Sequence, residues 1–441
     1  MSYKGTDLVE VRAWGKQVGA VTRDPNTGFC LFEYSEKWLK SGVSLSPLAM
    51  LNSNQIYSFP NLAPETFQRL PAMLADSLPD RFGNALVNRK LLTEGLRPEQ
   101  ITPLDRLVYM GERGMGALTF HPAWSPENEK TTVIALADLV AAAKKTLKGT
   151  FADSAMSDDA LAQLIQVGTS AGGARAKAVL AYNRTTKQYK SGQLPLEPGY
   201  EHWILKLDGV SKDKETGESD LVESADYCRI EYAYFLMARS CGISVSDCEL
   251  LPEGPRFHFL TKRFDRGDND QRIHMQSLCA VSQLDFNMSG THSYAQYFQT
   301  IRALGMGSAE LAEAFRRMVF NVVACNRDDH TKNFAFLLPE GGTWRLAPAF
   351  DLIYAHNMVD GFTVNHQMAV NGKYDKIELS DIRTEANREL IFDSENIITQ
   401  VLSGVERWPE FAKTAGVSPS SITRIHQDML ANHPGSALPA N

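Results

Sequence analysis

A net charge of −7 spread over 441 residues argues against a chain that grips nucleic acid along its whole surface. The composition, with 43% hydrophobic and 22% charged residues, is typical of a folded globular protein, and the length allows about two or three domains. The six cysteines include no Cys-x-x-Cys pair, so neither a zinc cage nor a disulfide framework is indicated. We expect a cytoplasmic protein without membrane association, because the start lacks a signal-peptide pattern and no run reaches the ~18 apolar residues of a membrane span.

Short β-prone runs separated by turn residues dominate the first half of the chain. They are predicted to form strands over residues 8–34, at the ends of 110–120 and 167–183, and over 201–208 and 256–265. Apolar residues with helical spacing occur over residues 60–92, 134–147, 157–166 and 222–239. From about Ser308 onward helices dominate, interrupted by one predicted hairpin at 334–350. A β-rich half therefore precedes a helix-rich half.

A glycine-rich stretch, "GTSAGGARAK", precedes one of the predicted strands. Gly168, Gly172 and Gly173 have no Cβ, so backbone N–H groups there could approach an anion closely. The stretch matches neither GxxxxGK[ST] nor GxGxxG after a strand. A phosphate loop and a plain flexible loop are both compatible with it.

A single lysine interrupts the apolar run "WILKLD". Lysine is rarely buried without a partner, so Lys206 indicates an anion nearby. One interpretation is an edge-strand lysine that reaches solvent with its amino group. The other places Lys206 on nucleotide phosphates, as kinases use a strand lysine.

The stretch "NRDDHTKNF" (326–334) follows a predicted helix and leads into the hairpin. A hairpin returns the chain to its starting end, so we expect Asn333 before it and Asp351 after it to lie side by side. An amide oxygen and a carboxylate held together suit Mg²⁺, which needs few protein ligands and takes the rest from phosphates and water. Asp328 lies five residues before Asn333, the spacing between catalytic base and metal ligand in protein kinases, whereas Asp329 lies four before it.

Structural alternatives exist for each residue of this cluster. Asp351 could cap the next helix, and Asn333 could bond the turn. His330 is interpreted as orienting the loop. A chance gathering of Asp, Asn and Asp around one hairpin is the less favoured explanation, because a lysine strand and a small-residue loop precede it.

Several motifs, in this order, resemble those of the HipA-like serine/threonine kinase toxins, a family of type II toxin–antitoxin kinases. The resemblance runs through most of the chain. It is carried by "DSLPDRFG" (76–83), "GERGMGALTF" (111–120), "SAGGARAK" (170–177), "HWILKL" (202–207), "IEYAYFLMARSCGISV" (230–245), "RFDR" (263–266), "DDHTKNF" (328–334) and "PAFDLI" (348–353).

The resemblance implies a role for each matching residue. Asp328 would accept the proton of the substrate hydroxyl, and Asn333 and Asp351 would hold Mg²⁺. A serine in the family's phosphate loop is autophosphorylated, which points to Ser170, with Thr169 as the alternative. Glu231, or else Glu223, would pair with Lys206. The residues implied to bind ATP are Gly172, Gly173, Ala174, Arg175, Ala176 and Lys177 along the phosphates, Lys206 on the strand, Lys262, Arg263 and Phe264 at an adenine hinge, and His330 and Lys332 in the loop.

The implied fold is a kinase-like α+β fold of two lobes. Its β-rich N-terminal part includes an extra small subdomain, and its C-terminal lobe is all-α. The expected boundaries are 1–125 for the N-terminal subdomain, 145–266 for the nucleotide-binding lobe and 267–441 for the catalytic lobe. The substrate would be a protein, with a translation component such as an aminoacyl-tRNA synthetase as the expected target and growth inhibition as the result. A small DNA-binding antitoxin of the HipB type would be the partner, and DNA would be met only through it.

One departure from the family pattern concerns the loop, where many relatives have Asp-Gly-His and this chain has Asp328-Asp329-His330. The second carboxylate could raise the pKa of the first by like-charge repulsion, or could point to solvent, with Arg327 near enough to offset it. Two other functions remain open: a small-molecule phosphotransferase of the aminoglycoside or choline type, and a non-catalytic scaffold that binds the antitoxin.

Overall fold

The structure, a computed structural model, describes residues 5–79, 81–93, 95–123, 177–192, 196–208, 220–357 and 361–435. The helices predicted over 134–147 and 157–166 and the glycine-rich loop lie outside these residues. The described chain divides into two compact units. The first takes in the described part of Met1–Gly217 with Leu251–Gln276 and Leu337–Thr343, and the second Glu218–Leu250, Ser277–Phe336 and the described part of Trp344–Asn441.

Two five-stranded sheets characterise the first unit, in the orders β4-β3-β2-β1-β5 and β7-β6-β8-β10-β9. The predicted strands are all present, whereas β4, β7 and β9 were not predicted from the sequence. The strands are β1 (Leu8–Ala13), β2 (Lys16–Arg23), β3 (Cys30–Tyr34), β4 (Ile56–Tyr57), β5 (Leu118–His121), β6 (Lys177–Asn183), β7 (Gln188–Ser191), β8 (Glu201–Lys206), β9 (Cys248–Glu253) and β10 (Arg256–Lys262).

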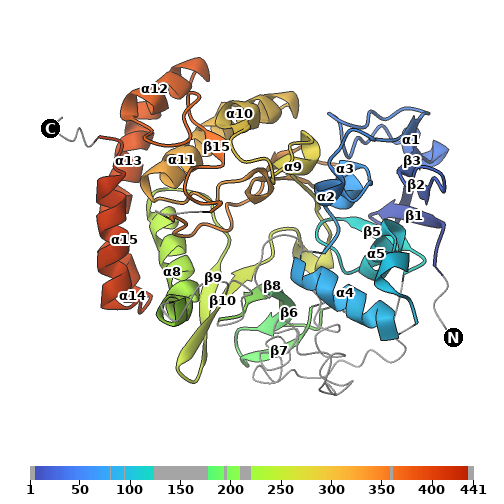
Figure 1. The fold of residues 1–441 in the computed structure, drawn as a ribbon, viewed down its shortest axis with the longest axis horizontal. Coiled ribbons are helices and arrows are strands. Elements are labelled where there is room, and N and C mark those ends of the chain that lie inside the picture. The colour runs from blue at the N-terminus through green and yellow to red at the C-terminus, as the bar shows by residue number, and fades with distance from the viewer. Residues whose placement is uncertain are drawn as a thin grey trace. The chain divides into compact units, whose positions relative to one another are not determined.

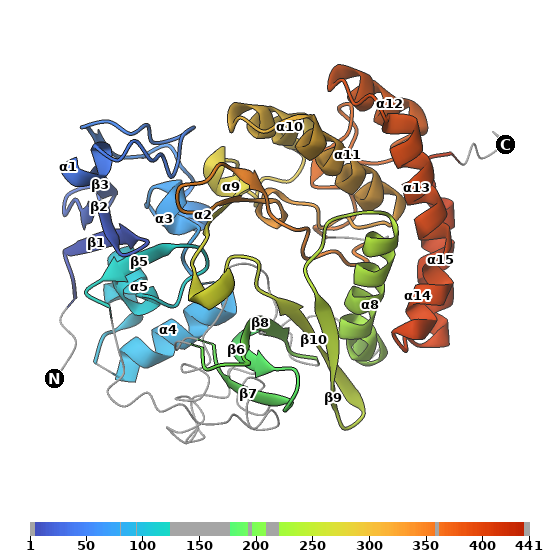
Figure 2. The same ribbon diagram turned by 180° about the vertical axis from the view of Figure 1, so that it is seen from behind.

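The first sheet forms because its strands alternate between buried and outward residues. In β1 the side chains of Val9, Val11 and Ala13 are fully buried, and the residues between them face outward. The helix α5 (Pro103–Met110) packs on β1, β2 and β5, as Figure 2 shows. The predicted small N-terminal sheet is therefore confirmed.

The predicted helical stretch 60–92 is divided into α2 (Pro64–Phe67), α3 (Ala72–Ala75) and α4 (Arg81–Thr93). Left-handed backbone at Gln68 and Arg69 ends α2, and Pro71 precedes α3. A proline lacks the N–H that a continuing helix needs, so apolar spacing alone overestimated this helix. The remaining short elements are α1 (Glu36–Leu39), η1 (Pro98–Gln100), η3 (Asp268–Asp270) and β11 (His274–Ser277).

Helices dominate the second unit, around one apolar core. In both Figure 1 and Figure 2, α13, α14 and α15 lie along α8, and Tyr234 of α8 packs edge-on against Trp408 with ring centroids 5.4 Å apart. The helices are α8 (Asp220–Ser240), α9 (Leu278–Val281), α10 (Tyr294–Ala303), α11 (Ser308–Val323), η4 (Thr331–Asn333), α12 (Leu379–Arg388), α13 (Ser394–Glu406), α14 (Trp408–Thr414) and α15 (Pro419–Ala431). No helix within the described residues is long and apolar enough to cross a membrane.

Short strands accompany these helices. β12 (His292–Ser293) pairs in parallel with β15 (Met368–Ala369), directly before α10 begins. The predicted hairpin is present as β13 (Ala335–Leu338) and β14 (Arg345–Leu346). It is closed by a 2.9 Å hydrogen bond from the N–H of Ala347 to the carbonyl of Ala335.

Candidate functional site

The loop 326–333 lies between α11 and the hairpin, as predicted. After the hairpin, the chain returns to the start of this loop. The N–H of Arg327 donates to the carbonyl of Ala355 at 2.9 Å, and the N–H of Ala355 donates to the carbonyl of Cys325 at 3.1 Å. The segment that carries Asp351 therefore runs beside the start of the loop.

Side chains along this loop alternate between buried and partly exposed. Arg327, Asp329 and Thr331 are buried, whereas Asp328 and His330 between them are partly exposed. Successive side chains of an extended chain point to opposite sides, which accounts for the alternation. From Arg327 to Thr331 the loop therefore has an inward set, made of Arg327, Asp329 and Thr331, and an outward set, made of Asp328 and His330.

Two members of the inward set bind neighbouring segments of the second unit. The guanidinium of Arg327 donates to Asp375 at 3.1 Å and to the side-chain oxygen of Asn432 at 2.9 Å. The hydroxyl of Thr331 donates to the carbonyl of Leu284 at 2.8 Å. Arg327 was expected to offset the charge of the second aspartate, Asp329, but its guanidinium bonds to these two groups and to the carbonyl of Val364.

Asp329, the third inward residue, accepts three hydrogen bonds. They come from the hydroxyl of Tyr294 at 2.8 Å, from Nδ1 of His366 at 3.0 Å, and from the backbone N–H of Gln367 at 2.7 Å. Burial, and next the nearby carboxylate, raise the pKa of the Tyr294 hydroxyl well above its usual value, so this hydroxyl stays a donor. The expectation that Asp329 could point to solvent is wrong, because its side chain is fully buried.

Asp328 and Asn333 are brought together. The side-chain amide of Asn333 donates from Nδ2 to the backbone carbonyl of Asp328 at 2.8 Å, which leaves Oδ1 of Asn333 to meet other groups. The carboxylate of Asp328 is 39% exposed, and Nε2 of His330 lies 3.6 Å from its Oδ1. The His330 ring packs between Phe286 and Phe362, with centroids 5.4 and 6.0 Å away, and so borders the carboxylate.

The donors proposed for Mg²⁺ fit the ion in kind, being an amide oxygen and a carboxylate. Asp351 has left-handed backbone (φ 53°) and follows Ala349, whose N–H donates to the carbonyl of Ser244 at 2.8 Å. Among the described residues no group of three or more His, Cys, Asp or Glu side chains could hold a metal. Asn333 and Asp351 would therefore rely on phosphate and water oxygens for the remaining ligands.

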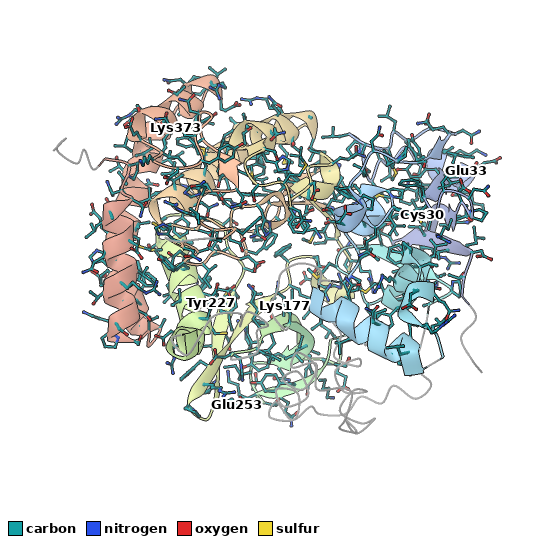
Figure 3. The ribbon with its side chains drawn as sticks, in the orientation of Figure 1. Cys30, Glu33, Lys177, Tyr227, Glu253 and Lys373 are labelled. Atoms are coloured by element: carbon teal, nitrogen blue, oxygen red, sulfur yellow. The ribbon has the colours of Figure 1, made fainter. Side chains whose placement is uncertain are left out.

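Lys206 has a second lysine as its neighbour. Lys177, labelled in Figure 3, is the first residue of β6 and lies directly opposite Lys206 in the antiparallel register with β8. Both are buried, at 7% exposure. Directly opposed residues share one face of a sheet, so the two lysine side chains lie on the same face of the β6–β8 pair. The amino group of Lys206 also lies 5.6 Å from the centroid of the Phe259 ring.

The "RFDR" stretch forms a buried ion cluster within the first unit. Asp265 accepts from Arg263 at 2.7 and 2.9 Å, from Arg266 at 2.7 Å, and from the N–H of Gly116 at 2.7 Å. Burial alone would raise the pKa of Asp265, but the charges of Arg263 and Arg266 outweigh it and hold the pKa well below its usual value. Burial, and next the like charge of Arg263, lower the pKa of Arg266 to about 9. This cluster was missed, although alternating charges in "RFDR" could have indicated ion pairs.

The residues expected at an adenine hinge are partly engaged within the sheet. The N–H of Arg263 donates to the carbonyl of His202 at 2.9 Å, and Lys262 pairs with Trp203 while its amino group binds Glu201. Within this triplet an adenine would therefore have to use backbone groups other than the N–H of Arg263.

The remaining predicted residues divide into two groups. Glu231 is described and lies buried in α8 at 3% exposure. The others lie outside the described residues or, for Glu223, have a side chain outside them: Thr169, Ser170, Gly172, Gly173, Ala174, Arg175, Ala176 and Glu223.

Comparison with protein families assigns almost the whole chain. The HipA N-terminal domain matches residues 9–121, and the HipA-like C-terminal domain matches residues 169–435. The chain belongs to the HipA family. The N-terminal part and the loop-bearing part of this HipA-family chain are thus assigned independently.

Curated relatives match shorter stretches. The protein named "Putative kinase Y4dM" of Sinorhizobium fredii is 28% identical over 187 residues, which are 37% of this chain and 44% of the relative. A protein of Haemophilus influenzae named "Putative kinase" is 27% identical over 105 residues, 22% of this chain and 31% of the relative. The matches therefore span less than half the length of these relatives.

A solved structure matches the fold from end to end. It is a chain in the complex of the Shewanella oneidensis MR-1 toxin–antitoxin system HipA, HipB and its operator DNA, with a TM-score of 0.66 and 17% identity over 96% of each chain. The predicted α+β fold of HipA type is confirmed.

Proposed function

We propose that this HipA-family protein is an ATP- and Mg²⁺-dependent serine/threonine protein kinase. The observation that carries the proposal is the loop 326–333, which holds Asp328 outward and closes the Asn333 side chain onto its carbonyl at 2.8 Å. A carboxylate five residues before such an asparagine is the arrangement of a kinase catalytic loop. The two relatives named as kinases support the same reaction class.

In the proposed mechanism Asp328 orients the hydroxyl of a protein serine or threonine and accepts its proton. Oδ1 of Asn333 and the carboxylate of Asp351 would hold Mg²⁺. When bound there, Mg²⁺ would supply neutralisation of the negative charge on the ATP phosphates. Lys177 and Lys206 would stabilise negative charge on the phosphates from the β6–β8 face, and Lys332 and His330 would border them in the loop.

Regulation by the phosphate loop is part of the proposal. Phosphorylated Ser170 would carry roughly −1.5 to −2 charges where ATP phosphates must bind, and would repel them. The loop amides of 172–176 would bind the phosphates when Ser170 is unmodified. Thr169 is the alternative acceptor.

The partners follow from the family. The HipA–HipB–DNA complex that shares this fold supports an antitoxin of the HipB type as the partner, with DNA contacted through it. The substrate would be a cytoplasmic translation component, and its phosphorylation would inhibit growth. Residues 1–125, 145–266 and 267–441 would serve as the N-terminal subdomain, the nucleotide-binding lobe and the catalytic lobe.

The test compares the wild type with Asp328→Asn in the presence of Mg·ATP, by intact mass and phosphosite mapping. Losing the proton acceptor should slow phosphorylation by roughly 10²- to 10⁴-fold, because general-base catalysis contributes that much. An exposed carboxylate in the same unit, changed as Asp393→Asn, is the control and should retain full activity.

The outcomes separate the proposal from its rivals. One added phosphate on Ser170 in the wild type and in the control, but not in Asp328→Asn, supports the kinase and its autoregulation. If ATP binds while an amino alcohol is phosphorylated and no protein is labelled, the small-molecule phosphotransferase replaces it. If calorimetry detects no ATP binding while antitoxin still binds, the scaffold function replaces it.

A further inference from the structure

Asp329 takes no part in the proposed transfer, yet it is fully buried and both of its carboxylate oxygens are engaged. Oδ2 accepts from Tyr294 and His366, at 2.8 and 3.0 Å, and Oδ1 accepts from the N–H of Gln367 at 2.7 Å. A buried carboxylate with three donors is strongly held, since hydrogen bonds to a charged group are worth about 1.5–3 kcal/mol each.

The three donors belong to one corner of the second unit. Tyr294 is the first residue of α10 and follows β12 directly, while His366 and Gln367 directly precede β15. β12 and β15 pair in parallel, His292 opposite Met368 and Ser293 opposite Ala369. We call this arrangement the β12–β15 corner. The pairing of β12 with β15 holds the two segments of this corner together. Asp329 therefore binds a part of the fold that is formed without the loop.

The network returns to the start of the loop. The hydroxyl of Tyr294 accepts from the side-chain amide of Asn321 at 3.0 Å, and the side-chain oxygen of Asn321 accepts from Asn326 at 2.9 Å. Asn321 and Asn326 are both buried. Asn326 and Asp329 are therefore tied, through α11 and α10, to the same corner.

We infer that Asp329 is a positioning residue, which holds the loop on the β12–β15 corner and so fixes the place of the neighbouring Asp328 carboxylate. The inference rests on the proposed kinase function. In this extended stretch the two side chains point to opposite sides, so a turn that released Asp329 outward would carry Asp328 inward. A displacement of about 1 Å in a reacting group can cost roughly 10²-fold in rate.

The central variant is Asp329→Asn, which preserves size but replaces one accepting oxygen by a donating NH₂ group. Facing three donors, the amide cannot satisfy all of them, so the loop should detach from the corner. A second pair of variants tests the partner: His366→Ala removes the donor, whereas His366→Asn keeps an N–H near the place of Nδ1.

The matched control is Asp381→Asn. Asp381 is also a buried carboxylate of the second unit with three donors, from Asn371 at 3.0 Å, Lys373 at 2.8 Å and the N–H of Glu378 at 2.9 Å. Its substitution should disturb stability in a comparable way without touching the loop.

Two measurements are made on each protein at a temperature where it is folded: kcat and the KM for ATP in phosphorylation, and hydrogen exchange of the peptide covering 326–334. We expect kcat to fall by about 10²-fold in Asp329→Asn and His366→Ala, with partial recovery in His366→Asn and a KM for ATP within about threefold of the wild type. Exchange in the loop should become about tenfold faster in the same two variants, and Asp381→Asn should change neither quantity.

A loss of kcat in Asp329→Asn no larger than in Asp381→Asn would overturn the inference, as would unchanged exchange in the loop. If the wild type transfers no phosphate, the proposed function fails. The exchange measurement then decides by itself whether Asp329 holds the loop.

Discussion

Two charged stretches of this chain, 263–266 and 326–333, look alike in sequence but are used differently. In the first, the side chains of Arg263, Asp265 and Arg266 are all buried, with at most 7% exposure, and bind one another and the backbone near Gly116. In the second, buried and partly exposed side chains alternate from Arg327 to Thr331, and Asp328 is 39% exposed.

The difference teaches that charge in a motif does not by itself indicate chemistry. A charged group whose partners are all internal joins segments of the fold, as Asp265 joins 263–266 to the loop at Gly116. A site needs charged groups that are held in place by other residues and can still meet a substrate. The alternation in 326–333 supplies both kinds of residue in one short segment.

The largest effect that tests this comparison is on stability. Asp265→Ala leaves the two buried arginines without their carboxylate, and we expect it to lower the free energy of unfolding by about 3–5 kcal/mol. Urea denaturation of the purified protein measures it. The stabilisation should be present above pH ~4 and be lost as the pH falls further, because the folded-state pKa of Asp265 lies below its unfolded value.

The exposed Asp268 of η3 provides the control, since Asp268→Ala should change stability by no more than about 0.5 kcal/mol. If Asp265→Ala has the same free energy of unfolding as the wild type, the 263–266 cluster does not stabilise the fold, and the contrast with the loop is wrong.

The next effect concerns nucleotide binding. Lys206→Met keeps the length and apolar character of the side chain but removes its charge, so the affinity for Mg·ATP should fall by roughly tenfold to a hundredfold, or about 1.5–3 kcal/mol. Calorimetric titration measures it. Lys190→Met, on the neighbouring β7, removes a lysine that pairs with Glu197 and should leave the affinity unchanged. If the wild type, Lys206→Met and Lys190→Met bind Mg·ATP with equal affinity, the β6–β8 face does not contribute to nucleotide binding.

The smallest expected effect is on the pH dependence of stability. Burial lowers the pKa of His274 to about 4, against 6.5 for an ordinary histidine. The unfolded chain therefore takes up a proton that the folded chain does not, and stability falls as the pH drops from 6.5 toward 4. Between pH 7 and 5 the loss from this residue should be about 2 kcal/mol.

His274→Met should make the decline between pH 7 and 5 shallower, as measured by urea denaturation at each pH. If the free energy of unfolding of His274→Met declines between pH 7 and 5 as steeply as that of the wild type, other groups take up the protons on unfolding. His274 would then not be held neutral by burial in the first unit.

Much of the fold could be predicted because its signals are local. Val9, Val11 and Ala13 alternate with outward residues, and turn residues bound the hairpin between Ala335 and Leu346, so period and turn chemistry sufficed. The division of 60–92 into three helices was not predicted, since it depends on left-handed backbone at Gln68 and Arg69. Apolar spacing carries no information about such a conformation.

The candidate site was predictable only in part. The spacing of Asp328 and Asn333 indicated that both belong to one site. The predicted hairpin indicated that the chain after it returns toward the loop. The partners of Asp329 lie 35, 37 and 38 residues away in sequence, and the pairing of β12 with β15 helps to bring their segments together. Contacts of that range follow from tertiary packing, which a single sequence does not display.

Because inward and outward side chains alternate in the loop, a change in its length should disturb it more than a substitution of one of its outward residues. Removing or inserting one residue between Arg327 and Thr331 would exchange the two sets, so that a catalytic carboxylate would face the β12–β15 corner and an anchoring one would face solvent. Replacing an outward side chain such as His330 leaves every inward hydrogen bond in place. In a library of loop variants that is selected for folding alone, substitutions at the outward positions should therefore be tolerated, whereas frame-preserving deletions of a single codon should be depleted as a class.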